Sequence, residues 1–455
     1  MLNNCPACLE KQQHIDQLLE ENRRLKQQLR YRQRQAEQGP FGSSTPSSKI
    51  PIKSNRPEEN QKKQGGAKPG HAGHGRKAIP AQSADRIESI EGWAHCPQCR
   101  GPLEEKGVQQ RSVLDSRPMR AERILYRLTK QYCPRCQKTL QAPAPGVLPK
   151  SFYGNQLITQ VIFSHYQQGI PLGQVCEQIG VAYSSVIDIL HRMARRFKGV
   201  LPVLVDQYRT SEVRHADETG WRVDGRSGYA WLFATPRLSV FLFRPTRSAR
   251  VVKEVLGETP LPGALVVDRY NAYNRSPCAL QYCYAHLLRE VEDLAQEFPD
   301  LPEVMAFTAS LIPLLAQAMH LHSQTLSDRQ YYRRARQLKT QVLKIVEAPA
   351  QQLGIRRIQD IFTENQHRLY LWVDHRNIPA DNNRAERELR PTVIARKVSF
   401  GSQSDAGAKT REILMSLIHT LSKRFQDPRA HFKSFLDRLV LDPQLDEAKI
   451  LFDSG

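Results

Sequence analysis

The sequence predicts a multidomain protein of the α+β class. Its 455 residues are too many for one simple core and suggest about three folded units. Runs rich in aromatic and β-branched residues between 205 and 285 predict strands, and the long apolar periodicity from 286 to 375 predicts helices. Two cysteine motifs near residues 96 and 133 add a small metal-binding module to this plan.

The charge of the chain points to a polyanionic partner. The formal net charge is +20, and a surplus of this size favours nucleic acid as the partner. An anionic membrane surface is the rival, but no apolar run approaches the ~18 residues of a spanning helix. The opening "MLNNCPACLE" lacks a basic segment followed by an apolar one, so no secretory signal is expected. We expect no membrane partner and a cytoplasmic location, where cysteines stay reduced.

The first 37 residues are predicted to form a coiled-coil helix. Apolar residues and one asparagine recur at alternating spacings of three and four, which is the heptad pattern. A buried amide at such a position tends to specify a parallel dimer, so we expect a homo-oligomer; a solvated lone helix is the alternative. The positions are Ile15, Leu18, Asn22, Leu25 and Leu29.

Residues 38–83 are predicted to be a flexible linker. The segment is rich in Gly, Ser, Pro and basic residues and has few large apolar side chains, so it cannot bury enough surface to fold alone. It could lie along DNA phosphates or serve as a plain tether.

A zinc-ribbon-like module is predicted over residues 84–150. The motifs "HCPQC" and "YCPRC" each turn two thiolates to one side, and together they complete a tetrahedral site for structural Zn²⁺. The predicted ligands are Cys96, Cys99, Cys133 and Cys136. The motif "CPAC" at Cys5 and Cys8 is only half a site, and whether it binds metal stays open.

The segment from 151 to 204 is predicted to be helical, with a helix-turn-helix pattern. One helix begins after Pro171 and ends at Gly180, and a second begins at Ser184, whose hydroxyl can cap free N–H groups. Such a pair can place its second helix in the DNA major groove. A hairpin that only packs gives the same pattern, so both interpretations stay open.

Acidic residues in two strands predict a metal site. The stretch "HADETG" is interpreted as a strand that ends at Asp217 and a turn at Gly220, and "GALVVDRYNAY" as a buried strand ending in Asp268. An aspartate after an apolar strand is costly to bury unless it binds something, and two adjacent carboxylates repel each other unless a cation lies between them. Oxygen ligands of this kind suit Mg²⁺ or Mn²⁺.

A third acid is predicted on a helix that begins near Asp381 or Asn382. Glu386 lies about one turn into that helix, and the neighbouring Arg387 and Arg390 could hold phosphates. Three carboxylates around two ions would activate a water or a 3′-hydroxyl and stabilise the leaving oxygen in a phosphoryl displacement. Taken one by one, the same acids could be ordinary caps or surface groups.

These motifs resemble those of the insertion sequence 66 family of bacterial transposases. The acidic motifs of the family are matched by "HADET", "VVDRYNAY" and "DNNRAERELRP". Further matches are "CYAHLLRE", "ARKVSFGSQSDAGA" and the linker phrases "FGSSTPSSK" and "KPGHAGHGR". The order of segments fits as well. After "ARK" the family commonly has Asn-Trp-Leu-Phe, whereas this chain has "VSF" and lacks the tryptophan.

The resemblance implies a ribonuclease-H-like core over residues 205–425, with a helical insertion at about 290–375 and a helical tail over 426–455. It implies a two-metal triad for Mg²⁺ or Mn²⁺ made of Asp217, Asp268 and Glu386. The implied reaction is cleavage of DNA at insertion-sequence ends, followed by transfer of the 3′-hydroxyl into target DNA. The implied partners are the terminal inverted repeats, target DNA and small accessory proteins of the same element.

Three further residues are candidate DNA contacts. His215 lies two residues before Asp217 and so faces the same side of the strand, where it could steer a scissile phosphate or simply pack. Arg396 and Lys397 could bind phosphates or form a solvated basic turn. Two other functions stay open: a zinc and helix-turn-helix DNA-binding regulator with an inactive core, and a hydrolytic nuclease without strand transfer.

Overall fold

The computed structural model describes residues 121–128, 130–133 and 138–452, with Gln82 and a few positions of an amino-terminal helix between 14 and 29. The chain divides into two units, residues 52–120 and the remainder, and the elements below belong to the second. Most of the predicted linker lies outside the described residues. So do five of the six cysteines in the predicted metal motifs, namely Cys5, Cys8, Cys96, Cys99 and Cys136.

A short hairpin carries the second cysteine motif. Strand β1 (Lys130–Cys133) pairs antiparallel with β2 (Lys138–Gln141), and Cys133 is opposite Lys138. Cys133 therefore ends β1, and the rest of the predicted knuckle lies outside the described residues. The zinc site itself stays a prediction.

The described positions near the amino terminus are helical, as predicted. The apolar side chains on this helix are about half exposed, from 48% at Ile15 to 58% at Leu29. Whether they pair with a second chain stays a prediction.

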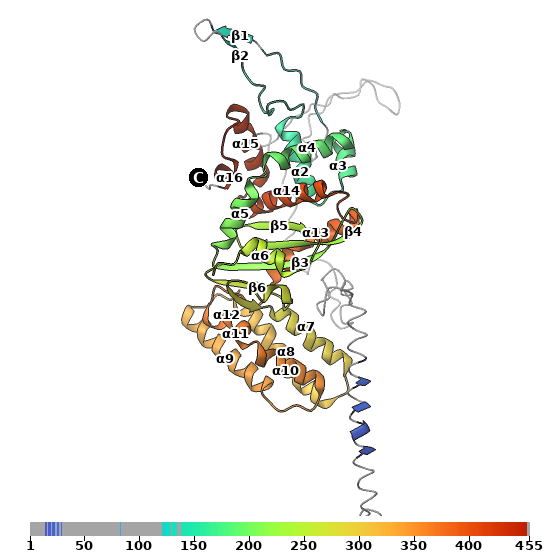
Figure 1. The fold of residues 1–455 in the computed structure, drawn as a ribbon. Coiled ribbons are helices and arrows are strands. Elements are labelled where there is room, and N and C mark those ends of the chain that lie inside the picture. Colours follow the sequence, from blue (N-terminus) through green and yellow to red (C-terminus); the bar gives the residue numbers. More distant parts are fainter. Residues whose placement is uncertain are drawn as a thin grey trace, which may run out of the picture. The chain divides into compact units, whose positions relative to one another are not determined.

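A five-stranded mixed sheet forms the centre of the described unit (Figure 1). The strand order is β5-β4-β3-β6-β7; β3, β4 and β5 are antiparallel neighbours, and β6 and β7 run parallel to β3. The sheet confirms the α+β class. Its strands are β3 (Val213–Val223), β4 (Arg226–Ala234), β5 (Ser239–Arg244), β6 (Ala264–Val267) and β7 (Ala279–Tyr282).

Strand β3 is longer than predicted. The prediction that it ends at Asp217 with a turn at Gly220 is wrong, because β3 pairs with β4 along its whole length as far as Val223. The turn is made by Asp224 and Gly225, whose φ angles are 51° and 72°. Two left-handed residues between antiparallel strands match the right-handed twist of a hairpin, and Asp-Gly is a favoured pair for this. Asp217 therefore lies inside a continuous strand.

One helix satisfies the open edge of the sheet. The edge strand β5 presents the N–H groups of Ser239, Phe241 and Phe243 to α14 (Asp405–Arg424). They donate to Thr420 Oγ1, Ser416 Oγ and Glu412 Oε2 over 3.1, 2.8 and 3.2 Å. Two strand residues span about the same length as four helical residues, so the two series stay in step. This covering removes an edge that could pair with another chain.

Helices on the far side of α14 complete this part of the core. Helix α14 lies between the edge strand β5 on one side and the helices α2 and α4 on the other, and it contacts all three (Figure 1). The other helices of this part are α2 (Asn155–Tyr166), α3 (Leu172–Ile179), α4 (Tyr183–Arg196), α5 (Val200–Arg209), α6 (Ala249–Leu256), α13 (Asn383–Ser399), α15 (Pro428–Leu441) and α16 (Glu447–Phe452).

The predicted helical hairpin is present, with one correction. Helix α3 begins after Pro171 and ends at Gly180, which has the left-handed conformation typical of a helix end. Helix α4 begins at Tyr183, and its cap residue Ala182 offers no side-chain hydrogen bond, so the predicted cap at Ser184 is wrong. Helix α4 packs on α14 through its buried face. Insertion into a DNA groove stays a prediction.

The predicted return to helix between the second and third acids is confirmed. Six helices follow β7 and lie together at the β6–β7 end of the sheet (Figure 1). They are α7 (Tyr284–Glu297), α8 (Pro302–Leu321), α9 (Asp328–Val346), α10 (Leu353–Glu364), α11 (Gln366–Leu369) and α12 (Leu371–Asp374).

Helix α8 corrects the expectation that no segment could span a membrane. It has 20 residues and is apolar enough to pass that test, although 39% of the tested window is buried inside the structure. The sequence search missed it because Thr, Ser, Gln and His interrupt its apolar run. The buried face of α8 contacts α7 and α9, so the same apolar content also fits a core helix.

We expect Ser416→Ala to destabilise the protein by about 1–3 kcal/mol, because the buried N–H of Phe241 would lose its acceptor. The matched control is Ser310→Ala, since both serines donate to a carbonyl one turn earlier but Ser310 is exposed. Urea unfolding gives the two free energies. Equal effects would contradict the role of Ser416 at the sheet edge.

Candidate active site

The two aspartates lie level with each other on adjacent parallel strands. In the pairing of β3 with β6, His215 is opposite Val266. Continuing this register by two residues brings Asp217 level with Asp268, which directly follows β6. Each carboxylate is fixed by a backbone N–H, of Glu218 to Asp217 and of Tyr270 to Asp268, both over 2.9 Å. The side-by-side arrangement predicted for these two acids is therefore present.

Helix α13 brings the third acid to the same face of β3. Glu386 lies in its first turn, as predicted. Alternate residues of β3 point to one side of a strand. Two of them touch α13: His215 is 3.0 Å from Asn382, and Thr219 accepts a hydrogen bond of 3.1 Å from Arg396. Asp217 lies between them and feels the charge of Glu386.

The three acids repel one another. Burial, followed by the charges of Glu218, Glu386 and Asp268, raises the pKa of Asp217 well above its ordinary value. Burial and the charge of Glu218 raise the pKa of Asp268 to about 7, against the hydrogen bond from Tyr270. Carboxylates in this state are stabilised in their ionised form by a bound cation. The donor set consists of oxygens, which fits Mg²⁺ or Mn²⁺.

Glu386 also belongs to a second group of ligand atoms. One nitrogen of Arg289 lies 3.1 Å from both of its oxygens, and Nδ1 of His286 lies 3.8 Å from Oε1. The ligand atoms of Cys283, His286 and Glu386 all lie within 4.8 Å of one another. Burial lowers the pKa of His286 to about 3, and its Nδ1 has no hydrogen-bond partner among the described residues. A thiol, an imidazole and a carboxylate together suit a softer metal such as zinc.

Asn382 connects the segments that carry the acids. It is 1% exposed. Its side chain donates to the carbonyl of Ala216 over 2.8 Å and accepts from His215 Nδ1, and its N–H donates to Cys283 Sγ over 3.0 Å. The N–H of Cys283 in turn donates to the carbonyl of Val267 over 2.8 Å. The sequence placed Asn382 only near the start of a helix; it is the residue before α13, and its side chain makes no cap bond.

Glu218 is a functional candidate that the sequence reasoning missed. It is buried on the opposite face of β3 from Asp217, where it forms an ion pair with Arg247 and accepts a hydrogen bond from Tyr273. The guanidinium of Arg247 lies 3.7 Å from the ring centre of Tyr270. This network holds the loop after Asp268 against β3. A signal was present: an acid within a strand that is buried on both faces needs a partner.

The predicted DNA contacts divide into two groups. Arg387, Arg390 and Lys397 are exposed on α13. His215 is buried, and burial lowers its pKa to about 3, so it is neutral and enclosed and is not placed to touch a phosphate. Arg396 donates to Thr219 and to the carbonyl of Gly220, which fixes α13 against β3. Its hydrogen bonds therefore serve the fold.

The comparison with protein families agrees with this geometry. Residues 150–410, more than half of the chain, match the profile described as Transposase IS66 family. The chain belongs to the IS66 family of transposases. Membership of this family indicates transposase function, and such enzymes act on DNA and generally use a divalent metal.

Three relatives from Sinorhizobium fredii (strain NBRC 101917 / NGR234) are similar to this chain, and all three are named as uncharacterized proteins. Protein y4jD is 25% identical over 389 residues, which is 76% of this chain and 74% of the relative. Protein y4qI is 24% identical over 420 residues, 82% of this chain and 76% of the relative. Protein y4hP is 21% identical over 400 residues, 78% and 72% respectively. The likeness to these relatives therefore covers more of the chain than the family match does.

We expect Asn382→Ala to destabilise the fold by about 2–4 kcal/mol, because a buried His215 and the carbonyl of Ala216 would both lose their partners. Asn377→Ala is the matched control, since that exposed side chain bonds only to the surface residue Glu212 among the described residues. Chemical unfolding compares the two. A cost for Asn382→Ala no larger than for the control would contradict the connecting role.

We expect Asp268→Asn to stabilise the metal-free protein above pH 7. Folding raises the pKa of Asp268 from its ordinary 3.8 to about 7, so the native state binds the proton more tightly than the unfolded chain. The stability of the wild type therefore falls as the pH rises through this window. In EDTA at about pH 8 the variant should gain about 1–3 kcal/mol, and the gain should vanish near pH 4.

The control for this experiment is Asp224→Asn in the exposed hairpin turn, which should change little at any pH. A gain for Asp268→Asn that does not depend on pH would mean that the effect is not electrostatic.

Proposed function

We propose that this IS66 transposase cleaves DNA at the ends of its insertion sequence and transfers the 3′-hydroxyl into target DNA. The observation that carries the proposal is the convergence of three acids on one face of β3: Asp217 and Asp268 at the same level, with Glu386 close enough to raise the pKa of Asp217. Two divalent cations bound there would activate the attacking hydroxyl and stabilise the leaving oxygen of an in-line displacement.

The sheet supports a ribonuclease-H-like fold for residues 205–425. Three antiparallel strands are followed by two strands that run parallel to β3. Asp217 lies in β3, and Asp268 directly follows the parallel strand β6. A helical block separates the second acid from the third, in agreement with the proposed insertion at about 290–375.

The residues around the acids have distinct roles in this proposal. Backbone N–H groups orient Asp217 and Asp268. Arg289 donates to both carboxylate oxygens of Glu386. Its guanidinium balances the negative charge of Glu386 while no cation is bound. The exposed Arg387, Arg390 and Lys397 on the same helix would bind phosphates of the DNA.

The remaining proposals concern the rest of the chain, its partners and its location. We propose structural Zn²⁺ at Cys96, Cys99, Cys133 and Cys136, dimer formation through the amino-terminal helix, and DNA contacts by the helical segment 151–204 and the linker. We also propose that small proteins of the same element assist, and that the protein acts in the cytoplasm, at the nucleoid.

The decisive experiment is cleavage of DNA that carries the ends of the element, in Mg²⁺, by the wild type and by Asp217→Asn, Asp268→Asn and Glu386→Gln. Each variant should lose at least about a hundredfold in rate, since several kcal/mol of transition-state stabilisation depend on the held ions. Binding of the same DNA in EDTA should persist. Asp224→Asn and Glu258→Gln remove exposed acids and serve as matched controls.

Each alternative function gives a different result. Full cleavage by Asp268→Asn would refute the triad. An inactive regulator would bind the ends and leave them intact in every variant, and a purely hydrolytic nuclease would produce free ends without any product joined to target DNA.

A further inference from the structure

Helix α9, in the helical block between the second and third acids, has a strongly basic outer face. Its 19 residues, "DRQYYRRARQLKTQVLKIV", contain six Lys or Arg and one Asp, a net charge of +5. The inner face of α9 is buried against α8, α10 and α12 through Tyr331, Ala335, Leu338 and Val342. The arginines Arg329, Arg333 and Arg336 are exposed on the outer face.

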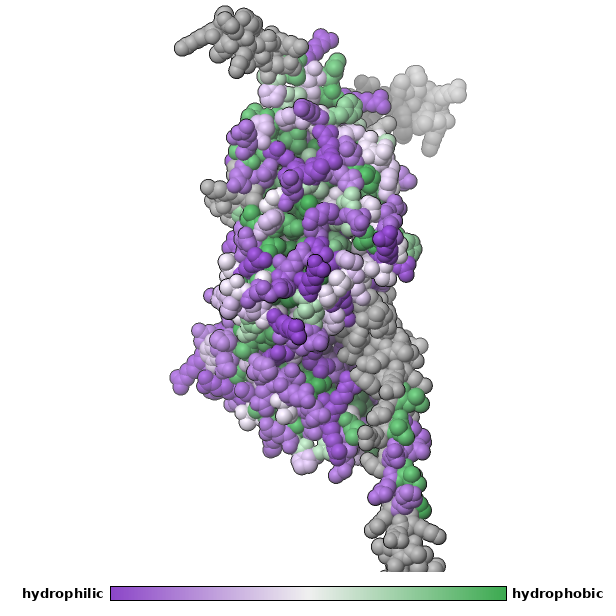
Figure 2. All heavy atoms as spheres, viewed as in Figure 1, coloured by the Kyte–Doolittle hydropathy of each residue, from purple (hydrophilic) through white to green (hydrophobic). Residues whose placement is uncertain are grey.

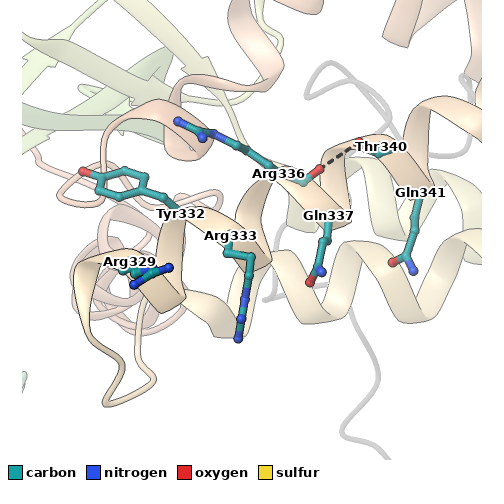
Figure 3. A pocket seen from close by; sticks show the side chains of 7 residues that line it. All are labelled: Arg329, Tyr332, Arg333, Arg336, Gln337, Thr340 and Gln341. Atoms are coloured by element: carbon teal, nitrogen blue, oxygen red, sulfur yellow. Dashed lines mark hydrogen bonds between the residues drawn. The ribbon is translucent and has the colours of Figure 1, made fainter.

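These arginines line an open pocket together with uncharged donors. Figure 3 shows Arg329 one turn before Tyr332 and Arg333 on α9, with Arg336, Gln337 and Thr340 further along the helix. Hydrophilic residues cover much of the helical block in the view of Figure 2. The pocket offers guanidinium, amide and hydroxyl groups and no carboxylate.

The positive charge on this face is not balanced by neighbouring acids. Among the residues that the structure describes, no carboxylate forms an ion pair with Arg329, Arg333 or Arg336. The one acid of α9, Asp328, pairs instead with Arg376 over 2.6 Å. By contrast, Arg244 is paired with both Glu254 and Glu412. A run of uncompensated arginines attracts a polyanion, and arginine forks match phosphate oxygens.

The spacing of the arginines fits a DNA strand. Along the helix axis, Arg333 and Arg336 lie about 6 and about 10 Å from Arg329. A duplex carries one phosphate per about 3.4 Å of axis on each strand, so the three side chains span about three phosphate-to-phosphate steps of one strand.

Helix α9 is also firmly joined to the segment that leads into the third acid. The hydroxyl of Tyr331 donates to the carbonyl of Trp372 over 2.8 Å, and the ion pair of Asp328 with Arg376 adds a second link. The chain then reaches Asn382 and the helix that carries Glu386. DNA held on α9 would therefore keep a fixed relation to the acids.

We propose that the outer face of α9 binds the phosphate backbone of target DNA during strand transfer. The inference rests on the proposed function. Phosphate contacts position a duplex but carry no sequence information. The face has cationic and neutral donors and lacks an acidic acceptor, which suits DNA that is bound through its backbone, whatever its sequence.

The test measures binding of a random-sequence duplex in EDTA over a series of salt concentrations. The variant Arg329→Gln, Arg333→Gln and Arg336→Gln should lower the slope of log affinity against log salt by about 2–3, since each lost phosphate contact removes about 0.9. The matched control replaces Arg237, Arg356 and Arg438 by Gln, three exposed arginines outside α9. The control should change the slope by less than about 1. Equal slopes for the two triple variants would overturn the proposal.

A second measurement separates target DNA from end DNA. In Mg²⁺ the α9 variant should cleave end-bearing DNA as the wild type does, and should join fewer ends to the random duplex. Loss of end cleavage together with joining would assign the face to end DNA and overturn the proposal. A wild type that binds the duplex but never cleaves would instead refute the proposed function, because the binding assay in EDTA needs no catalysis.

Discussion

The arrangement of the three acids depends on the hydrogen bonds that meet at Asn382. The side chain of this one buried asparagine bonds to β3 at Ala216, and its backbone N–H bonds to Cys283, the residue that follows β7. Cys283 passes the connection to Val267, the residue directly before Asp268. Each acid therefore lies a few residues from a member of one short chain of hydrogen bonds. In a buried setting every such bond is costly to leave unmade, so the segments keep one relative position.

This constraint is needed because the site works against the fold. Burial and neighbouring carboxylates raise the pKa values of Asp217 and Asp268, so the ionised forms of these two acids oppose the folded arrangement. The surrounding structure opposes this with neutral bonds to the backbone and with paired charges, such as Arg247 with Glu218 and Arg289 with Glu386. Functional sites commonly break local rules and are stabilised by their surroundings.

The sequence predicted what short-range patterns determine. Apolar runs located β4, β5 and β6, helical periodicity located the block after β7, and Gly180 marked the end of α3. Two boundaries were wrong for tertiary reasons. Pairing with β4 carries β3 past Asp217 to an Asp-Gly turn, and α4 begins before Ser184 without a side-chain cap. In both cases the tertiary context outweighed the local signal.

The partners of the site residues could not be predicted, because they come from distant parts of the chain. His215 was a candidate phosphate ligand by its spacing from Asp217, yet that same spacing directs it toward Asn382. Arg396 is basic and close to Lys397 in sequence, but it bonds to Thr219 and Gly220. A buried, paired cation contributes to structure, whereas an exposed and uncompensated one attracts ligands. The net charge of the chain therefore indicated a polyanionic partner. Which basic residues can bind that partner depends on their burial and ion pairing, and the sequence does not show these.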